Sequence, residues 1–199
     1  MKKLLVLLFS IFFLISSHSV FADDISDFEI EGMSIGDSLL DYFSLKEIKQ
    51  REISAYHYKD DAFIMIDFEK PQFSQYELVQ FTYKPNDKNY KIYGIEGLIF
   101  SIENINECLK NKDKIVNELS IFFGNNVEKV ERGKVTHGAD ITGNSYVTSV
   151  YFYFDSGGFI DVGCYDWSAE LTKENAWSDH LRASIISQEF DIFLLGDPF

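Results

Sequence analysis

The two cysteines of this 199-residue chain lie in segments of different predicted secondary structure, so a bond between them would fix one segment against the other. Cys108 falls within residues 104–124, where apolar side chains recur on one helical face. Asn104 is suited to cap the start of this helix and Gly124 to end it. Lys112 and its charged neighbours are expected to face water. The pattern predicts one long amphipathic helix over about 105–123, with a buried side made of Ile105, Cys108, Leu109, Ile115, Val116, Leu119 and Phe123.

The other cysteine, Cys164, lies in the second of two predicted strands, 146–155 and 159–167. Glycines at the junction favour a three-residue loop, which is expected to set Phe154 opposite Ile160. A register shifted by one residue would instead turn an acidic side chain into the core. In the favoured register Cys164 shares a face with the apolar residues of the hairpin and points toward the layer of the predicted helix.

Residues 1–22 have the features of a secretory signal peptide. Two lysines precede an apolar run over 4–15, and a polar stretch ends with small residues at the positions that a signal peptidase reads. Cleavage near Ala22 is predicted, leaving residues 23–199 as a single domain in the periplasm or outside the cell. An uncleaved anchor is the alternative, although the apolar run is about half as long as a bilayer span.

Export makes one intrachain disulfide, Cys108–Cys164, the favoured state of the two cysteines. A free reactive thiol and a bond that links two copies are the alternatives.

The formal net charge of −14 excludes some classes of partner. Removal of the signal would leave the chain more acidic still, because that segment carries two lysines and no acid. Such a chain is a poor ligand for nucleic acid or anionic lipid, whose phosphates would repel it. No later stretch is apolar enough to cross a membrane, so a transmembrane protein is not expected.

The other segments predict short strands and short helices. The spacing between strands is too small for crossover helices, so the sheet should be largely antiparallel. We expect an α+β fold with the long helix, about 105–123, packed on one face of the sheet, together with short N-terminal helices. Residues 167–179 are expected to hold one helical turn at most. The expected strands are 62–68 (covered on both faces), 76–83, 90–102, 126–131, 134–137 and 181–187; the expected short helices are 37–43, 44–51 and 188–195.

Aromatic residues gather on the face of the predicted hairpin that points away from the long helix. They could form a platform for a glycan, a peptide or another envelope protein, because such rings combine a large contact area with polar tips. Coverage of these rings by other segments is the alternative. The candidate binding residues on this face are Tyr151, Tyr153, Tyr165, Trp167 and Asp161.

Catalytic and metal-binding signatures are not found in the sequence. His57, His137 and His180 lie in unrelated segments without metal-ligand spacing, so neither a metal site nor a cofactor is expected. The acidic loops lack the spacing of a calcium-binding loop. Asp140, Asp161 and Asp166 could supply paired carboxylates for acid–base chemistry, but nothing in the sequence fixes their separation.

Two resemblances rest on particular stretches. Residues 30–43, with Ile30-Glu31-Gly32-Met33-Ser34 before a short helix, resemble the opening of BamE-like and β-lactamase-inhibitor-like modules, which bind other proteins. The Leu-Gly-x-Pro that often closes that helix is replaced by Asp41-Tyr42-Phe43-Ser44, so the fold of those modules does not carry over. GMSIGDSLLDYFS, YKIYGIEGLIF, CYDWS and LRASIISQEF together are similar to an uncharacterised group of small secreted bacterial proteins, and that similarity implies no known activity.

These observations favour a non-catalytic secreted or periplasmic binding protein of unknown partner. A small secreted hydrolase that uses carboxylates is the alternative, and it would need two converging acids beside Trp167. A carrier of small ligands is a third possibility, which would need an apolar cavity between helix and sheet. Large side chains such as Phe123 and Phe152 are expected to fill that space.

Overall fold

The computed structural model describes residues 24–69, 71–100, 104–196 and 198. The expected signal peptide and its cleavage position near Ala22 therefore lie outside the described residues. The strands are β1 Glu29–Ile30, β2 Met33–Ser34, β3 Tyr56–His57, β4 Ile64–Glu69, β5 Leu78–Tyr83, β6 Gly94–Ile99, β7 Glu128–Thr136, β8 Tyr146–Tyr153, β9 Phe159–Asp166 and β10 His180–Ile186. The helices are α1 Leu45–Arg51, α2 Ile105–Phe123, α3 Ala169–Asn175 and α4 Gln188–Leu195, with 3₁₀ turns at Ile25–Asp27, Leu39–Asp41, Glu52–Ser54 and Lys59–Asp61.

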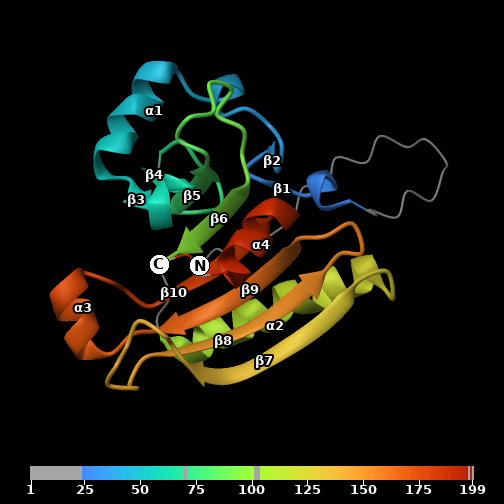
Figure 1. Ribbon diagram of the computed structural model, residues 1–199. Helices are drawn as coiled ribbons and strands as arrows, with labels where there is room; N and C mark the ends of the chain where they lie inside the picture. Colours follow the sequence, from blue (N-terminus) through green and yellow to red (C-terminus); the bar gives the residue numbers. More distant parts are fainter. Residues whose placement is uncertain (1–23, 70, 101–103, 197, 199) are drawn as a thin grey trace, which may run out of the picture.

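Eight strands form one antiparallel sheet in the order β3-β4-β5-β6-β10-β9-β8-β7. The order shows two meanders, β3–β6 and β7–β10, each built from strands that follow one another in the chain. They join where β10 pairs with β6, and we call this pair of strands the seam. Figure 1 shows the first meander in the upper half of the molecule and the second in the lower half. The predicted α+β class is confirmed.

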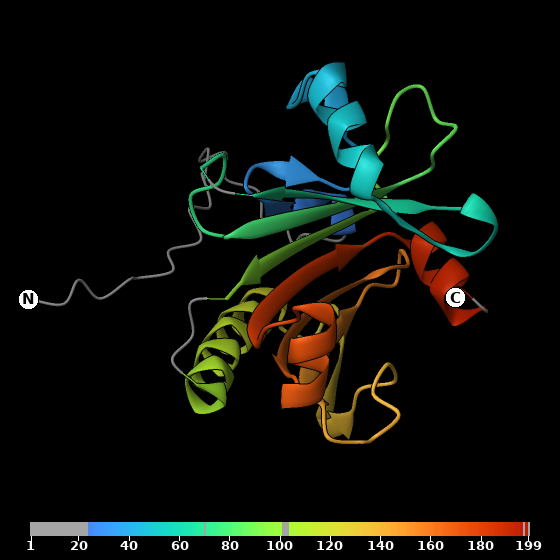
Figure 2. The same ribbon diagram turned by 90° about the vertical axis from the view of Figure 1, so that its left-hand side faces the viewer.

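The long helix is confirmed at α2, where the Asn104 side chain accepts hydrogen bonds from two backbone N–H groups of the first turn. Gly124 follows it at a φ of 57°, a left-handed value that glycine adopts without a steric penalty. The Cys108–Cys164 disulfide is also confirmed, with 6.0 Å between the two Cα atoms. It fixes α2 across β9 and β10, as Figure 2 shows from the side.

The sheet face that α2 covers continues under α1. Strand pairing places Phe68 of β4 and Cys164 of β9 on one side of the sheet. Phe43, just before α1, stacks on Phe68 with 4.0 Å between the ring centres. A capping box made by Ser44 and Glu47 begins α1. One apolar core therefore runs beneath both helices.

The short β1–β2 hairpin packs on this core between the two helices. Phe28, which precedes β1, lies 5.0 Å from the Phe123 ring of α2. The Glu31 carboxylate accepts hydrogen bonds from the backbone N–H groups of Ser74, Gln75 and Tyr76 at 3.0, 2.6 and 3.0 Å. These bonds stabilise the ionised form, outweigh the effect of burial and lower the pKa of Glu31. The ionised side chain of Glu31 thereby connects the N-terminal hairpin to the segment before β5.

The β8–β9 hairpin turns over residues 154–158, not over the predicted three-residue loop between 155 and 159, and its register differs. Phe152, not Phe154, lies opposite Ile160. Phe154 donates its N–H to the carbonyl of Gly158, which lies at a φ of 81°. The register prediction was wrong by two residues, and a shift of two keeps every side chain on its expected face. The prediction that Cys164 points toward α2 is therefore unaffected by the register error.

Other predicted elements need correction. The two short strands expected at 126–131 and 134–137 are one strand, β7, because a bulge between Arg132 and Lys134 lets pairing with β8 continue past Gly133. Residues 167–179 hold more helix than expected, since Ser168 caps the seven-residue α3. The helix expected at 37–43 is only the 3₁₀ turn at 39–41. Strand β4 is covered on one face alone, and Asp67 is exposed on the other.

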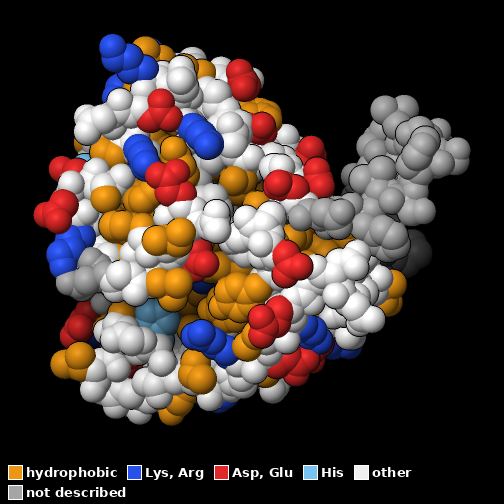
Figure 3. Space-filling model, turned by 45° about the vertical axis from the view of Figure 1, so that its right-hand side comes forward, with side chains coloured by type: hydrophobic (Ala, Val, Ile, Leu, Met, Phe, Trp, Pro, Cys, Tyr) orange, Lys and Arg blue, Asp and Glu red, His pale blue; other side chains and the backbone are white. Residues whose placement is uncertain are grey.

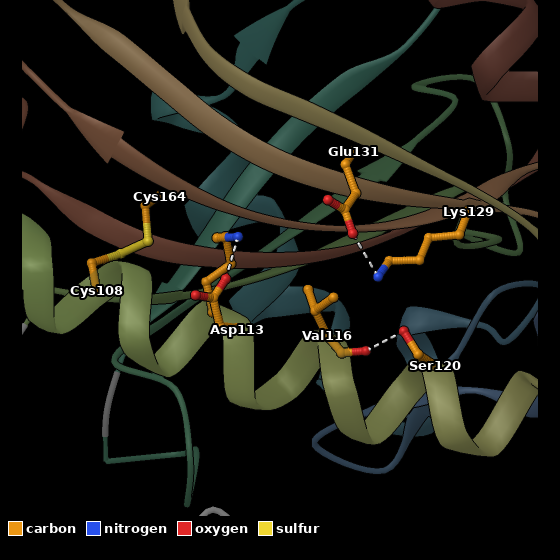
Figure 4. Close-up of polar contacts among 8 residues, drawn as sticks. Cys108, Asp113, Val116, Ser120, Lys129, Glu131 and Cys164 are labelled. Carbon is orange, nitrogen blue, oxygen red and sulfur yellow. Dashed lines mark hydrogen bonds and ion pairs between the residues drawn. A yellow bond between two sulfur atoms is a disulfide. The ribbon is translucent and has the colours of Figure 1, made fainter.

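Lys112 is buried, contrary to the prediction that it faces water. It lies on the covered stripe of α2, and its side chain is 8% exposed. Its Nζ is 2.7 Å from Oδ1 of the exposed Asp113 and lines a polar cleft of about 240 Å³ between α2 and β7. Figure 4 shows Lys129 and Glu131 extending from β7 toward α2 at this cleft. A lysine can be buried in this way when its ammonium group still reaches a polar cleft.

Removal of the disulfide is expected to lower the free energy of unfolding by about 4 kcal/mol, because the bond closes a loop with a sequence separation of 56 residues. The variant is Cys108→Ala with Cys164→Ala, measured by urea unfolding under oxidising conditions. Wild type with reductant is the control and should match the variant. Equal stability of oxidised wild type and variant would contradict the structural role of the bond.

Replacement of Lys112 by methionine is expected to leave the free energy of unfolding within about 1 kcal/mol of wild type or to raise it, because an apolar isostere avoids burial of the charge. Lys112→Ala is expected to lower it by about 2 kcal/mol through lost packing. Lys114→Met on the exposed side of α2 is the control. A large loss of stability in Lys112→Met would show that the ammonium group itself is required.

Candidate functional site

The sheet face opposite α1 and α2, which we call the open face, is covered among the described residues by a helix at one end only. There α4 packs Phe190 and Phe193 against Phe63, with ring centres 5.0 and 5.1 Å apart. Beyond α4, the strands of the seam and of the β8–β9 hairpin present their alternate side chains outward. Figure 3 shows hydrophobic, histidine and basic side chains gathered around a hollow in the molecule's surface.

The five candidate binding residues predicted from the sequence all belong to the open face. Tyr151 and Tyr153 alternate on β8 with the buried Phe152 and are half-buried. Tyr165 and Asp161 of β9 are buried, with 6% and 1% of their surface exposed. Trp167, which follows β9, is half-buried. The structure therefore brings these residues together on one surface, but it exposes only the three outer rings.

The centre of the open face is an ion cluster built around Arg182 of β10. Its Nη1 is 3.0 Å from Oε2 of Glu96 on β6, and its Nη2 is 3.5 Å from Oδ2 of Asp161 on β9. The guanidinium carbon lies 4.6 Å from the ring centre of Tyr165, a cation–π distance. Ser184 donates its hydroxyl to Oε2 of Glu96 at 3.4 Å. The cluster crosses the seam, since its two carboxylates come from different meanders.

Burial and charge shift the pKa values in this cluster. Burial raises the pKa of the Glu96 carboxyl, and the nearby Arg182 offsets this only in part. Burial alone would lower the pKa of Arg182, but Tyr165, Glu96 and Asp161 outweigh it and hold that pKa well above its ordinary value. Arg182 therefore stays charged, and Glu96 holds its proton to higher pH than an exposed glutamate does.

Several buried polar atoms of the open face have no hydrogen-bond partner. They are Oδ2 of Asp161, Nε of Arg182, Oγ of Ser149 and Nε1 of Trp167. A buried polar atom without a partner costs about 1–3 kcal/mol, so a native structure rarely leaves several on one surface. The set contains both hydrogen-bond donors and acceptors. Because these atoms are buried, neither bulk solvent nor a ligand resting on the surface contacts them in this structure.

Aromatic rings lie at both ends of the ion cluster. At one end the Trp167 ring is 4.6 Å from that of Trp177 and 4.5 Å from the imidazole of His137. At the other end Tyr151 and Tyr153 are nearly parallel, with 5.8 Å between ring centres. Arg132 of β7 lies 5.0 Å above the ring of Tyr151. The open face thus has two aromatic ends and a charged middle.

The buried imidazole of His180 stacks on Tyr165 at 4.6 Å. Burial lowers the pKa of His180 to about 4, against the smaller effect of its hydrogen bond with the Ser178 carbonyl oxygen. His180 is therefore neutral near pH 7. Burial also lowers the pKa of His137.

The remaining carboxylates do not join Asp161. Asp140 accepts hydrogen bonds from the hydroxyls of Thr142 and Ser145, both at 2.6 Å, so it shapes its own loop. Asp166 lies on the opposite sheet face and pairs with Lys134 at 3.5 Å. In the described part of the chain, no three histidine, cysteine or acidic side chains are grouped so that they could hold a metal ion.

Apart from the polar cleft beside β7, the space between α2 and the sheet is nearly full. The cavity lined by Phe28, Leu119 and Val162 has a volume of about 20 Å³, which is room for one water molecule. A small-ligand carrier would need a much larger apolar cavity at this position.

Sequence reasoning missed Glu96 and Arg182, the two residues that complete the cluster with Asp161. Each had a visible signal. Glu96 is the lone charge in a strand of apolar residues and glycine, and Arg182 is the lone permanent charge in a mostly apolar strand. A lone charge in a buried strand needs a partner, but the pairing of β6 with β10 cannot be read from one sequence.

Comparisons with family models, with curated proteins and with solved structures gave no match to this chain. The two resemblances stated from the sequence therefore stay predictions, and the argument about function rests on the geometry of the open face. Among the described helices, none combines the length and the apolar character that crossing a bilayer requires. The disulfide is typical of an oxidising, extracytoplasmic location.

Glu96→Gln is expected to alter how stability depends on pH. The raised pKa means that protonated Glu96 contributes stability fully below its ordinary pKa of 4.5, and that this contribution is lost as the pH rises through the folded-state value. The variant is therefore expected to gain on wild type between pH 5 and pH 8 in urea unfolding. The lowered pKa of His180 makes stability depend on pH in the opposite direction. Because both proteins contain His180, its contribution cancels when their stabilities are compared. A difference independent of pH would contradict the prediction.

Proposed function

We propose that this chain is a non-catalytic binding protein that uses the open face to hold a partner in the cell envelope or outside the cell. The observation that carries the proposal is the contrast between the two sheet faces. One face is covered by α1, α2 and the β1–β2 hairpin, while the other presents half-buried rings around buried polar atoms without partners. Rings with polar surroundings are the usual composition of a binding surface.

The proposal also includes a location outside the cytoplasm. A signal peptide over residues 1–22, cleaved near Ala22, would deliver the chain to the periplasm or the medium. The disulfide supports this, because cytosolic thiols are kept reduced. The net charge of −14 disfavours nucleic acid as the partner, because its phosphates would repel the chain.

A secreted hydrolase is a second candidate, favoured by one observation. Glu96 and Asp161 approach the same guanidinium, and burial raises the pKa of Glu96, as in a general acid. Against it, the guanidinium lies between them and fixes both carboxylates in ion pairs. Hydrolysis of a bound ligand that is abolished by Glu96→Gln would favour this candidate over pure binding.

The binding function predicts that an envelope component is retained by the open face. The purified protein is crosslinked in its own envelope extract beside a Tyr151→Ala, Tyr153→Ala, Trp167→Ala variant. Loss of these rings is expected to reduce retention of the partner about tenfold or more, because aromatic residues dominate binding energy. The matched control is Tyr42→Ala, an exposed ring just before α1. Equal retention by all three proteins, or by none, would reject the open face as the binding surface.

A further inference from the structure

Strand β7 forms one edge of the large sheet. It is the longest of the described strands, nine residues over Glu128–Thr136, and it pairs with β8 on one side only. In the described part of the chain no strand pairs with its outer side, and Figure 1 shows it at the lower border of the second meander. Alternate backbone N–H and C=O groups along such an edge point outward without a strand partner. The opposite edge, β3, has only two residues and offers no comparable length for pairing.

The side chains of β7 carry charges of both signs. The strand has three basic and two acidic residues and is slightly basic, whereas the whole chain has a net charge of −14. Two copies of so acidic a chain repel each other in general, and β7 does not share the acidic character that causes this repulsion. Whether a second copy is attracted or repelled at β7 therefore depends on which of its charges lie opposite one another.

Symmetry limits the registers in which two β7 strands can pair. In an antiparallel pair related by a two-fold axis perpendicular to the sheet, one residue lies directly opposite its own copy. A charged residue at this position would meet an identical charge, which is destabilising, so the charged residues of β7 are excluded as centres. A centre at Gly133 fails because it sets Arg132 opposite Lys134. Centres at Val135 and Thr136 leave only the end of the strand to overlap.

The remaining centre, Val130, sets opposite charges against each other on both sides of the axis. Lys129 then lies opposite Glu131 of the second copy, and Glu128 lies opposite Arg132 of the second copy. Each contact occurs twice because of the symmetry, and Val130 meets its own copy at the axis in an apolar contact. The paired stretch is residues 128–132, because the bulge that follows interrupts the regular strand.

The side chains that these contacts require lie at the edge and are accessible. Lys129 and Glu131 extend on the α2 side of the sheet, with Nζ and Oε1 2.8 Å apart (Figure 4). Their side chains are 33% and 69% exposed. On the open face, Arg132 lies above the ring of Tyr151, and Val130, which pairs with Tyr151, is half-buried. Pairing of two copies would extend the ion pair of Lys129 and Glu131 into a ring of four alternating charges around the axis.

We propose that β7 pairs with β7 of a second copy, antiparallel and centred on Val130, to form a two-fold symmetric dimer. The axis is perpendicular to the sheet, so the two open faces point in the same direction and both α2 helices lie on the other side. Such a dimer would present two open faces to one partner or surface, which raises the apparent affinity without any new contact. The dimer uses a different surface from the proposed binding function and does not depend on it.

Sedimentation velocity of the purified protein tests the dimer. Pairing over residues 128–132 makes a contact at the small, transient end of known interfaces, so the association should be weak and reversible. We expect a dissociation constant of about 0.1 mM, with monomer predominant at about 5 µM and dimer predominant at about 500 µM.

Exchange of two charges tests the register. Glu131→Lys would set a lysine opposite Lys129 of the second copy, and Lys129→Glu would set a glutamate opposite Glu131 of the second copy. Each single variant is expected to weaken dimerisation about tenfold or more. Both substitutions in one chain restore opposite charges and should restore the dimer. A mixture of the two single variants should form a mixed dimer, because the glutamates of one chain then face the lysines of the other.

Two comparisons separate a local effect from a change in overall charge. Lys134→Glu, on the same strand but beyond the bulge, makes the chain as acidic as Lys129→Glu does and is expected to dimerise like wild type. Glu131→Lys makes the chain less acidic, so general repulsion between copies cannot explain its loss of the dimer. Thermal unfolding of each variant establishes that it is folded.

Monomers at every concentration would overturn the inference and would show that the charges and the bulge of β7 protect this edge from pairing. A dimer that persists in Glu131→Lys uses another surface or register and also overturns it. So does a dimer that is lost in the single variants and is restored neither by the exchange nor by mixing. None of these results changes whether the open face retains a partner in the crosslinking experiment, so the two proposals fail separately.

Discussion

The guanidinium of Arg182 neutralises two carboxylates that belong to different halves of the sheet. Glu96 comes from the last strand of the first meander and Asp161 from the hairpin of the second, so the ion cluster forms only when both halves are in register. Removal of the guanidinium would leave two acids buried side by side, a cost of several kcal/mol. The same three side chains define the floor of the open face. Stability and binding therefore depend on one electrostatic arrangement.

The two faces of β9 show how one strand can contribute to both stability and binding. Cys164 points to α2 and is bonded to it, while Asp161 and Tyr165 point to the open face. The strand is buried on both sides, although no helix lies over the middle of the open face among the described residues. Side chains of neighbouring strands cover it there, Arg182 above all. This explains how an acid can be 1% exposed on a sheet face that no described helix covers at that point.

Local patterns in the sequence were enough to predict α2, the capped α1, the C-terminal helix and the faces of the β8–β9 hairpin. Each of these depends on periodicity or capping within a short segment. The two cysteines then supplied one contact between distant segments. The ion cluster could not be predicted in this way, because Glu96 and Arg182 meet only through the β6–β10 pairing across a long stretch of chain. The burial of Lys112 was missed for a related reason, since helical spacing alone could not show that the charged edge strand β7 would leave a polar cleft beside it.

The strand order has a consequence for how the chain can be shortened or synthesised. β10 is the last strand in the sequence, yet it occupies an inner place in the sheet, between β6 and β9. A ribosome delivers it after all other strands of the sheet, so β6 and β9 each have an unpaired inner edge until β10 arrives, and such edges invite pairing with other chains. A nonsense codon just before His180 would remove the strand that unites the two halves. Strand β10, although it follows every other strand along the chain, lies in the middle of the sheet.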